Sequence, residues 1–213
     1  MKITIVYDNS LAKPGLRTGW GFSSLLETDH AKPLLFDAGA NGPDLLYNMS
    51  RLGIDPSSIG TVVISHGHGD HTGGLLNFLE VNREAAIYLP ASVLARLPGR
   101  EVTWVDRPVR IVEGVYSTGE LGGIEQSLII ETDKGLVVMT GCSHPGVGSI
   151  LDAASIRGSI YGIIGGLHGF NDFNLLEGLP LVCPCHCTQH MDELRHLFPE
   201  QYTACGAGFE LEL

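Results

Sequence analysis

Residues 61–74 read Thr-Val-Val-Ile-Ser-His-Gly-His-Gly-Asp-His-Thr-Gly-Gly, an apolar run followed at once by histidines, an aspartate and glycines. The run at 61–64 predicts a short strand at the buried centre of a sheet, because an apolar run suits a strand that is covered on both faces. Loops that follow such strands are where layered α/β folds place their functional sites. The stretch therefore predicts an α/β fold and the position of a site within it.

The residues after this strand have the composition and spacing of a metal site. Residues two apart in an extended segment face the same way, so His66 and His68 can bind one metal together. Asp70 and His71 can then face a second metal. Imidazole and carboxylate groups suit zinc, with manganese and iron as alternatives. A solvated loop is the other interpretation, but three histidines and an aspartate within six residues favour metal binding.

Three later segments repeat the order of apolar strand, small residues and histidine. They contain His144 (residues 140–146), His168 (163–169) and His186 (183–188). We expect His144 and His186 to complete the metal site, whereas His168 fits either the site or a surface loop. Cys142 can be a ligand or a small buried thiol, and the second is the commoner fate of a free cysteine.

Two other features bear on the predicted site. Asp37 ends the predicted strand at 33–36, where its carboxylate can hydrogen-bond the neighbouring ligand loop. The alternative for Asp37 is an ordinary turn aspartate. Cys183, Cys185 and Cys187 stand at alternate positions, which does not match the spacing of a zinc finger. We therefore expect these cysteines to be buried packing residues.

Composition limits the class of protein. A chain of 213 residues suits a single domain over 1–213 with a core of its own. Asp and Glu outnumber Lys and Arg by 24 to 13, and the formal net charge of −11 argues against nucleic-acid and anionic membrane partners. No apolar run approaches the ~20 residues of a membrane span. Five cysteines without the framework of a secreted mini-protein fit a reducing cytoplasm.

Strands and helices are mixed along the chain, which predicts α/β layering. Helices are expected at 43–52, where Gly53 supplies a stop, at 146–156, and up to residue 197 from a cap at Thr188. Strands are expected at 2–7, 21–28, 33–36, 61–64, 86–89, 102–105, 109–112, 127–131, 135–140, 159–164, 179–182 and 209–213.

The segment Phe-Asp-Ala-Gly at 36–39 and the pattern His66-x-His68-x-Asp70-His71 resemble the first motif and the signature of the metallo-β-lactamase superfamily. The resemblance implies a four-layer αββα sandwich with a two-metal site at one edge of the sheets. It also implies an enzyme with two divalent metal ions as cofactors.

Five segments, in chain order, resemble the 7,8-dihydropterin-6-methyl-4-(β-D-ribofuranosyl)aminobenzene 5'-phosphate synthase subgroup of that superfamily: 64–74, 125–128, 140–146, 164–168 and 184–188. The resemblance implies a first metal on His66, His68 and His144, and a second on Asp70, His71 and His186. It further implies catalytic roles for Asp70, which can orient the attacking group, and for His168 and Glu125, which can contact substrate or move a proton. The sequence departs from the superfamily at Cys142, which stands where an aspartate usually bridges the metals. The segment between Gly74 and Glu125 is also short for the subgroup.

These observations lead to three functional hypotheses. The first is a binuclear-metal enzyme that acts on a small anionic substrate, phosphate- or diphosphate-bearing and of pterin type, by group transfer or hydrolysis. The second is a generic metal-dependent hydrolase of an ester or phosphoester. The third is a metal- or pterin-binding protein without catalysis. Two metals can clamp the attacking and leaving groups of either reaction, so local chemistry alone does not separate transfer from hydrolysis.

Overall fold

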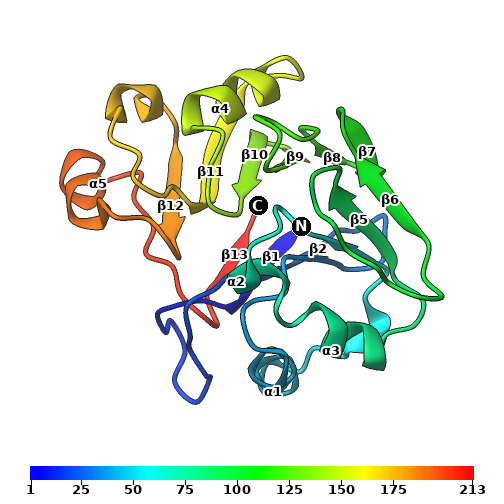
Figure 1. The fold of residues 1–213 in the computed structure, drawn as a ribbon. Coiled ribbons are helices and arrows are strands. Elements are labelled where there is room, and N and C mark those ends of the chain that lie inside the picture. Colours follow the sequence, from blue (N-terminus) through cyan, green and yellow to red (C-terminus); the bar gives the residue numbers. More distant parts are fainter.

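The computed structural model describes all 213 residues and contains two β-sheets packed face to face (Figure 1). The first sheet has seven strands in the order β13-β1-β2-β3-β4-β5-β6, and the second has six in the order β12-β11-β10-β9-β8-β7. The first sheet contains β1 (Lys2–Tyr7), β2 (Ser23–Glu27), β3 (Leu34–Phe36), β4 (Thr61–Val63), β5 (Ala86–Pro90), β6 (Val102–Val105) and β13 (Glu210–Glu212). The second contains β7 (Val109–Val112), β8 (Val115–Ser117), β9 (Leu128–Thr132), β10 (Gly135–Thr140), β11 (Ile160–Gly166) and β12 (Leu181–Cys185).

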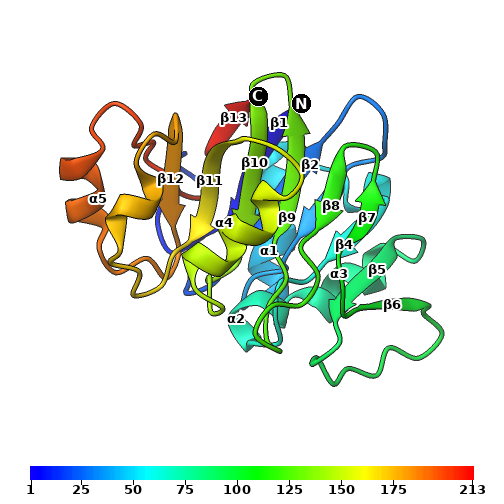
Figure 2. The same cartoon turned by 90° about the horizontal axis from the view of Figure 1, so that it is seen from above.

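Helices cover the outer face of each sheet, as both views of the fold show (Figures 1 and 2). On the first sheet lie α1 (Gly42–Leu52) and α3 (Leu75–Val81), and on the second lie α4 (Val147–Ser155) and α5 (Met191–Leu197). The short α2 (Gly69–Thr72) belongs to the loop after β4, and residues Pro56–Ser58 and Phe173–Leu176 form 3-10 turns. The predicted four-layer αββα sandwich is therefore confirmed.

The central strands are apolar on both faces because each sheet is covered on both sides. On β10, Met139 packs into the core between the sheets, whereas Val138 packs beneath the helices of the second sheet. On β4, Val63 faces the core between the sheets and Val62 faces α1 and α3. Alternate side chains along each strand thus pack into two different cores, and because both sets are apolar the sequence is an unbroken apolar run.

Local signals placed several elements correctly. Helix α1 begins after Asn41, whose side chain accepts a hydrogen bond from the Asp44 amide, and ends at Gly53 in the left-handed conformation. The predicted cap at Thr188 is wrong, because α5 begins three residues later, at Met191. The Thr188 hydroxyl instead donates to the Cys185 carbonyl (2.8 Å) and accepts from the Leu167 amide (2.9 Å). Strand β8, which the sequence pattern missed, is only three residues long.

The parallel strands bring several loops to one edge of the sandwich. Strand β3 runs parallel to β4 in the first sheet, and β10, β11 and β12 run parallel to one another in the second. The carboxyl ends of parallel strands meet at the same edge of a sheet, so the loops that follow these five strands are neighbours in space. None of the helices combines the length and the apolar character that crossing a membrane requires.

Candidate metal centre

The six residues predicted as metal ligands gather at this edge, although they come from three loops. His66, His68, Asp70 and His71 follow β4, His144 follows β10, and His186 follows β12. The ring centroids of His66 and His144 are 4.7 Å apart, and those of His71 and His186 are 4.9 Å apart. The tertiary fold therefore joins residues that are more than a hundred positions apart in the chain into one cluster.

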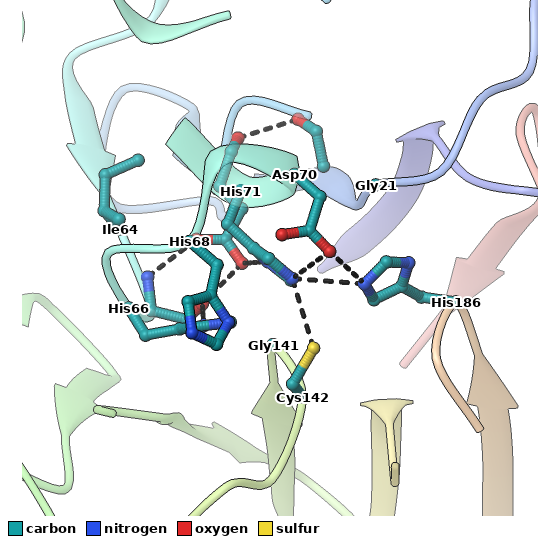
Figure 3. A network of polar contacts seen from close by, with 12 residues as sticks. Gly21, Ile64, His66, His68, Asp70, His71, Gly141, Cys142 and His186 are labelled. Carbon is teal, nitrogen blue, oxygen red and sulfur yellow. Dashed lines mark hydrogen bonds and ion pairs between the residues drawn. The ribbon is translucent and has the colours of Figure 1, made fainter. Parts of the chain in front are cut away.

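The donor atoms of this cluster form two compact sets. In the first set, ligand atoms of Asp70, His71, Cys142 and His186 all lie within 4.8 Å of one another, and Figure 3 shows these side chains converging. In the second set, ligand atoms of His66, Cys142 and His144 likewise lie within 4.8 Å of one another. His68 stands beside the second set, with its Nδ1 3.0 Å from the Nε2 of His66. The structure thus offers two adjacent places for a metal ion.

Hydrogen bonds at the far side of the rings fix which nitrogen of His71 and His186 faces the first set. The Nδ1 of His71 donates to the buried Asp37 carboxylate (2.7 Å), and the Nδ1 of His186 lies 3.1 Å from Asn9 Oδ1, which accepts from it. In each neutral ring the Nε2 atom then carries a lone pair. The Nε2 atoms of His71 and His186 lie 3.1 Å apart, and the Asp70 carboxylate lies 3.3 Å from the Nε2 atom of His186.

The same network orients His66. Ser65 donates its hydroxyl hydrogen to Asp37 (2.7 Å), so it accepts from the Nδ1 of His66 at 2.9 Å. The Nε2 of His66 is therefore also a lone pair directed into the site. Asp37 additionally accepts from the Ser65 amide at 2.6 Å. The predicted hydrogen bonding of Asp37 to the ligand loop is thus confirmed, and this one carboxylate sets the ring state of two ligands.

These donor atoms fit divalent metal ions. Two lone-pair nitrogens and a carboxylate oxygen that face one another at these distances repel unless a metal ion or a proton lies between them. Burial opposes protonation of His71, but the neighbouring Asp37 and Asp70 carboxylates outweigh it and raise the pKa of this ring, so in the metal-free protein a proton on its Nε2 occupies the place that a metal ion would take. The Nε2 atom of His144 is buried and has no hydrogen-bond partner, which is costly for a polar atom unless it binds a metal. Burial, reinforced by His71, lowers the pKa of His186 to about 4, and burial also lowers the pKa of His66. Both rings are then neutral at pH 7, which is the form that binds metals.

The backbone around the site is strained. The four non-glycine residues with positive φ are Asp37 (60°), Ser143 (62°), His168 (48°) and His186 (49°), and all four lie in the loops that form the site. Each such residue costs about 1–3 kcal/mol, and the surrounding structure must hold it. For His186, Asp8 accepts from its amide (3.1 Å) and Asn9 donates to its carbonyl oxygen (2.9 Å).

Glu125 lies beneath the loop after β10 and is fully buried. One carboxylate oxygen accepts from the Thr140 hydroxyl and from the amides of Gly141, Cys142 and Ser143 at 2.9–3.1 Å. The other oxygen accepts from the His144 amide at 2.8 Å. Its lone pairs are thus directed at the chain's own donors. This placement suits a residue that positions the loop, and it differs from the substrate contact that the sequence suggests.

The next residue, Gln126, ties the two sheets together at the site. Its side-chain amide donates to the Ile64 carbonyl (2.8 Å), and its backbone amide donates to the Ser65 carbonyl (2.9 Å). Glu125 holds the loop after β10 while Gln126 holds the end of β4. The close approach also explains Gly141, because a β-carbon at that position would collide with the Ser65 side chain.

The remaining predicted residues lie at the mouth of the site. His168 is exposed, and its ring centroid is 5.1 Å from that of His144, whereas the Asp70 side chain is 19% exposed. Sequence reasoning missed Asp8, Asn9 and Trp20, whose indole lies 5.2 Å from the ring of His186 and is 62% exposed. A signal was present for the first two, because polar residues directly after an apolar strand also marked Asp37.

Comparisons with known proteins agree with this fold. The sequence profile of the metallo-beta-lactamase superfamily matches residues 18–154. The 7,8-dihydropterin-6-methyl-4-(beta-D-ribofuranosyl)-aminobenzene-5'-phosphate synthase of Methanocaldococcus jannaschii is 29% identical over 251 aligned positions, which cover 85% of this chain and 84% of that protein. Tm1679, a metal-dependent hydrolase of the beta-lactamase superfamily, is 29% identical with a TM-score of 0.78, over 100% of this chain and 99% of that chain. A diphosphatase from the PhnP family, 16% identical, shares the fold with a TM-score of 0.64 over 100% and 97% of the two chains.

The matched profile contains the ligand loops after β4 and β10, and the structural alignments extend over the remainder of the chain, including β12 and His186. By sequence profile and by fold, this chain belongs to the metallo-β-lactamase superfamily.

Proposed function

We propose that this chain is a single-domain, binuclear-metal enzyme that acts on a small phosphate- or diphosphate-bearing substrate. The observation that carries the proposal is the pair of adjacent donor sets, in which the Nε2 atoms of His71 and His186 face each other at 3.1 Å. A second observation is chemical: with a net charge of −11, the chain needs a local positive charge to hold an anion. Two divalent cations at this edge supply that charge.

The predicted ligands divide between the two places. His66, His68 and His144 would hold one ion, and Asp70, His71 and His186 would hold the other. Zinc is the proposed metal because it accepts imidazole and carboxylate ligands in tetrahedral sets, and manganese and iron are the alternatives. When bound, such a pair of ions polarises phosphoryl oxygens and lowers the pKa of water.

Residues of the chain supply orientation and proton transfer. The Asp70 carboxylate, which reaches the surface of the site, orients the attacking group in this proposal. The exposed ring of His168 lies 5.1 Å from that of His144 and is not among the proposed metal ligands. It can therefore exchange a proton with a substrate amine or leaving group while the metal ligands stay in place. Asp37, Ser65 and Glu125 remain beneath the ligands and hold their geometry.

Group transfer is the reaction that the sequence relationship favours. The relative from Methanocaldococcus jannaschii is a synthase, and the identity extends over most of both chains. In the proposed reaction, an arylamine nitrogen attacks the methylene carbon of a pterin-methyl diphosphate. The carbon–oxygen bond to the diphosphate breaks, pyrophosphate leaves, and the nitrogen loses one proton. Hydrolysis is the second candidate, because the similar Tm1679 is described as a hydrolase and matches the chain from end to end.

One incubation separates these reactions. Metal-replete protein is mixed with a pterin-methyl diphosphate and an arylamine, and both pyrophosphate and the joined pterin–arylamine product are measured. We expect joined product in equal amount to pyrophosphate, and chelator-treated protein is the control. Pyrophosphate with pterin alcohol and no joined product supports hydrolysis. Protein that contains two ions but releases no pyrophosphate contradicts the enzyme proposal and favours a binding role.

Trp20 provides an optical test of the metal place formed by Asp70, His71 and His186. The protein has two tryptophans, so a Trp104→Phe variant emits from Trp20 alone, whose ring lies 5.2 Å from that of His186. We expect cobalt(II) to quench this emission until the site is filled, because the indole is then a few ångströms from a ligand of the ion. The matched Trp20→Phe variant, which retains the half-exposed Trp104, should show little quenching. Equal quenching in both variants would place the ion elsewhere.

A further inference from the structure

Cys142 occupies the point at which the two donor sets meet. It is the second residue after β10, its side chain is buried, and it is the residue common to both sets. Its Sγ atom lies 3.2 Å from the Nε2 of His71, and Figure 3 shows the sulfur directed at the cluster of Asp70, His71 and His186. The backbone here is fixed, because the Cys142 amide donates to Glu125 at 2.9 Å.

We infer that the Cys142 sulfur is a thiolate ligand shared by both metal ions. The inference rests on the proposed binuclear function and adds to it the identity of the bridging group. It also gives the site a sulfur donor, which the six histidine and aspartate ligands do not provide.

Distances within the first set support coordination. Zinc–nitrogen and zinc–sulfur bonds of about 2.0 and 2.3 Å at tetrahedral angles separate two donor atoms by about 3.3–3.5 Å. The separations from His71 Nε2 to His186 Nε2 and to Cys142 Sγ are 3.1 and 3.2 Å. Those from Asp70 Oδ2 to the His186 and His71 Nε2 atoms are 3.3 and 3.7 Å. Four of the six donor separations are therefore close to those of one tetrahedral ligand set, and the other two, from Cys142 to Asp70 and His186, lie within 4.8 Å.

A buried, metal-free thiol does not satisfy the same atoms. One S–H group can donate to the Nε2 of His71, or a His71 ring protonated at Nε2 can donate to that of His186, but neither arrangement supplies a donor to the second set. On the other side, the buried Nε2 of His144 remains without a partner. A sulfur bonded to both ions is consistent with every one of these lone pairs, because each ring then has a cation to bind.

The sulfur ligand has two chemical consequences. Thiolate is a soft ligand, so it should select zinc, cobalt or iron over manganese and magnesium. Two dications bring four positive charges, and Asp70 with the Cys142 thiolate removes two of them. The remaining charge of about +2 suits a substrate that carries a phosphate or diphosphate.

Cobalt(II) titration tests the shared sulfur directly, because a cobalt–thiolate bond gives a near-ultraviolet charge-transfer band. Metal-free wild-type protein should bind two cobalt ions per chain, and the band should grow during both equivalents. Cys142→Asp keeps an anionic donor, so it should bind two ions without the band. Cys142→Ala should bind at least one ion with affinity lower on the order of 10²-fold or more, since even residues that only support a ligand contribute about 10- to 100-fold.

The control is Cys187→Ala, which removes another buried thiol, whose Sγ lies 3.9 Å from the Cys142 carbonyl oxygen, and should keep the band. A band that persists in Cys142→Asp, or one that is complete after the first equivalent, overturns the shared sulfur. Two bound ions without any band in the wild type overturn the sulfur ligand but leave the binuclear proposal intact. A single bound ion with the band overturns both the bridge and the binuclear site.

Discussion

Replacing His186 with alanine is expected to remove one metal ion and lower turnover on the order of 10³-fold, while the fold survives. His186 is the ligand that β12 contributes, and without it the set of Asp70, His71 and Cys142 is left with three donors. A metal ion contributes several kcal/mol to the stability of a phosphoryl-type transition state, and about 1.4 kcal/mol corresponds to a tenfold change in rate. His68→Ala should likewise lose metal from the neighbouring place, where its Nδ1 lies 3.0 Å from His66.

Elemental analysis of purified protein measures the metal content, and far-ultraviolet circular dichroism checks the fold. His196→Ala is the matched control, since this exposed histidine lies on α5 away from the donor sets. Metal content that stays unchanged in both the His186 and the His68 variants would contradict the ligand assignment. Loss of metal with full activity would instead contradict the proposed function and leave the ligands intact.

Replacing Glu125 with alanine is expected to destabilise the metal-free protein by about 3–5 kcal/mol. The change leaves four backbone amides and the Thr140 hydroxyl without their acceptor in a buried place. Each buried donor without a partner costs about 1–3 kcal/mol, and because these donors share one loop their effects do not add fully. Glu125→Gln keeps a carbonyl oxygen for most of these donors but sets an amide group against the His144 N–H, so we expect a smaller loss.

Urea unfolding of metal-free protein measures this effect, and competition with a coloured chelator measures metal affinity. We expect affinity to fall about 10- to 100-fold in Glu125→Gln, because Cys142 and His144 lose their fixed backbone. Glu113→Gln, which changes an exposed glutamate, should alter neither quantity. If Glu125 served only to contact substrate, its replacement would lower activity while stability and metal affinity stayed at their wild-type values.

Sequence reasoning identified the proposed ligands because each one follows an apolar strand within a short loop, which contains glycine in the His66–His71 and His144 segments and proline and cysteine in the His186 segment. Strand β4 and the His66–His71 pattern required no tertiary information, since a run of ligands two and three residues apart is a local feature. His144 and His186 were found by the same local order of strand and loop. The role in substrate contact that the resemblance implied for Glu125 does not match the buried position of its carboxylate. No local feature of the sequence distinguishes a carboxylate that faces substrate from one that accepts hydrogen bonds from five buried donors.

The same contrast holds for Cys142. As a sequence feature it fits a buried thiol, which is the commoner fate of a free cysteine. Its sulfur lies beside both donor sets because β10 in the second sheet packs against β4 in the first. Cys142 and His71, which come into contact there, are 71 residues apart in the chain. Asp8 and Asn9 depend on the fold in the same way, because they reach His186 across 177 or more positions.

The residue pattern by itself determined α/β layering, because apolar runs predict strands covered on both faces and helices with one apolar face pack against them. The four-layer αββα order was implied by the resemblance to the superfamily. It also predicted which imidazoles are candidate metal ligands, since their loops carry the same local order of apolar strand, small residues and histidine. The tertiary structure alone decided how those donors are oriented and held. The ring states set by Asp37 and Asn9, the loop held by Glu125 and the meeting point at Cys142 are contacts between distant segments, whose distances exist only once the two sheets have packed.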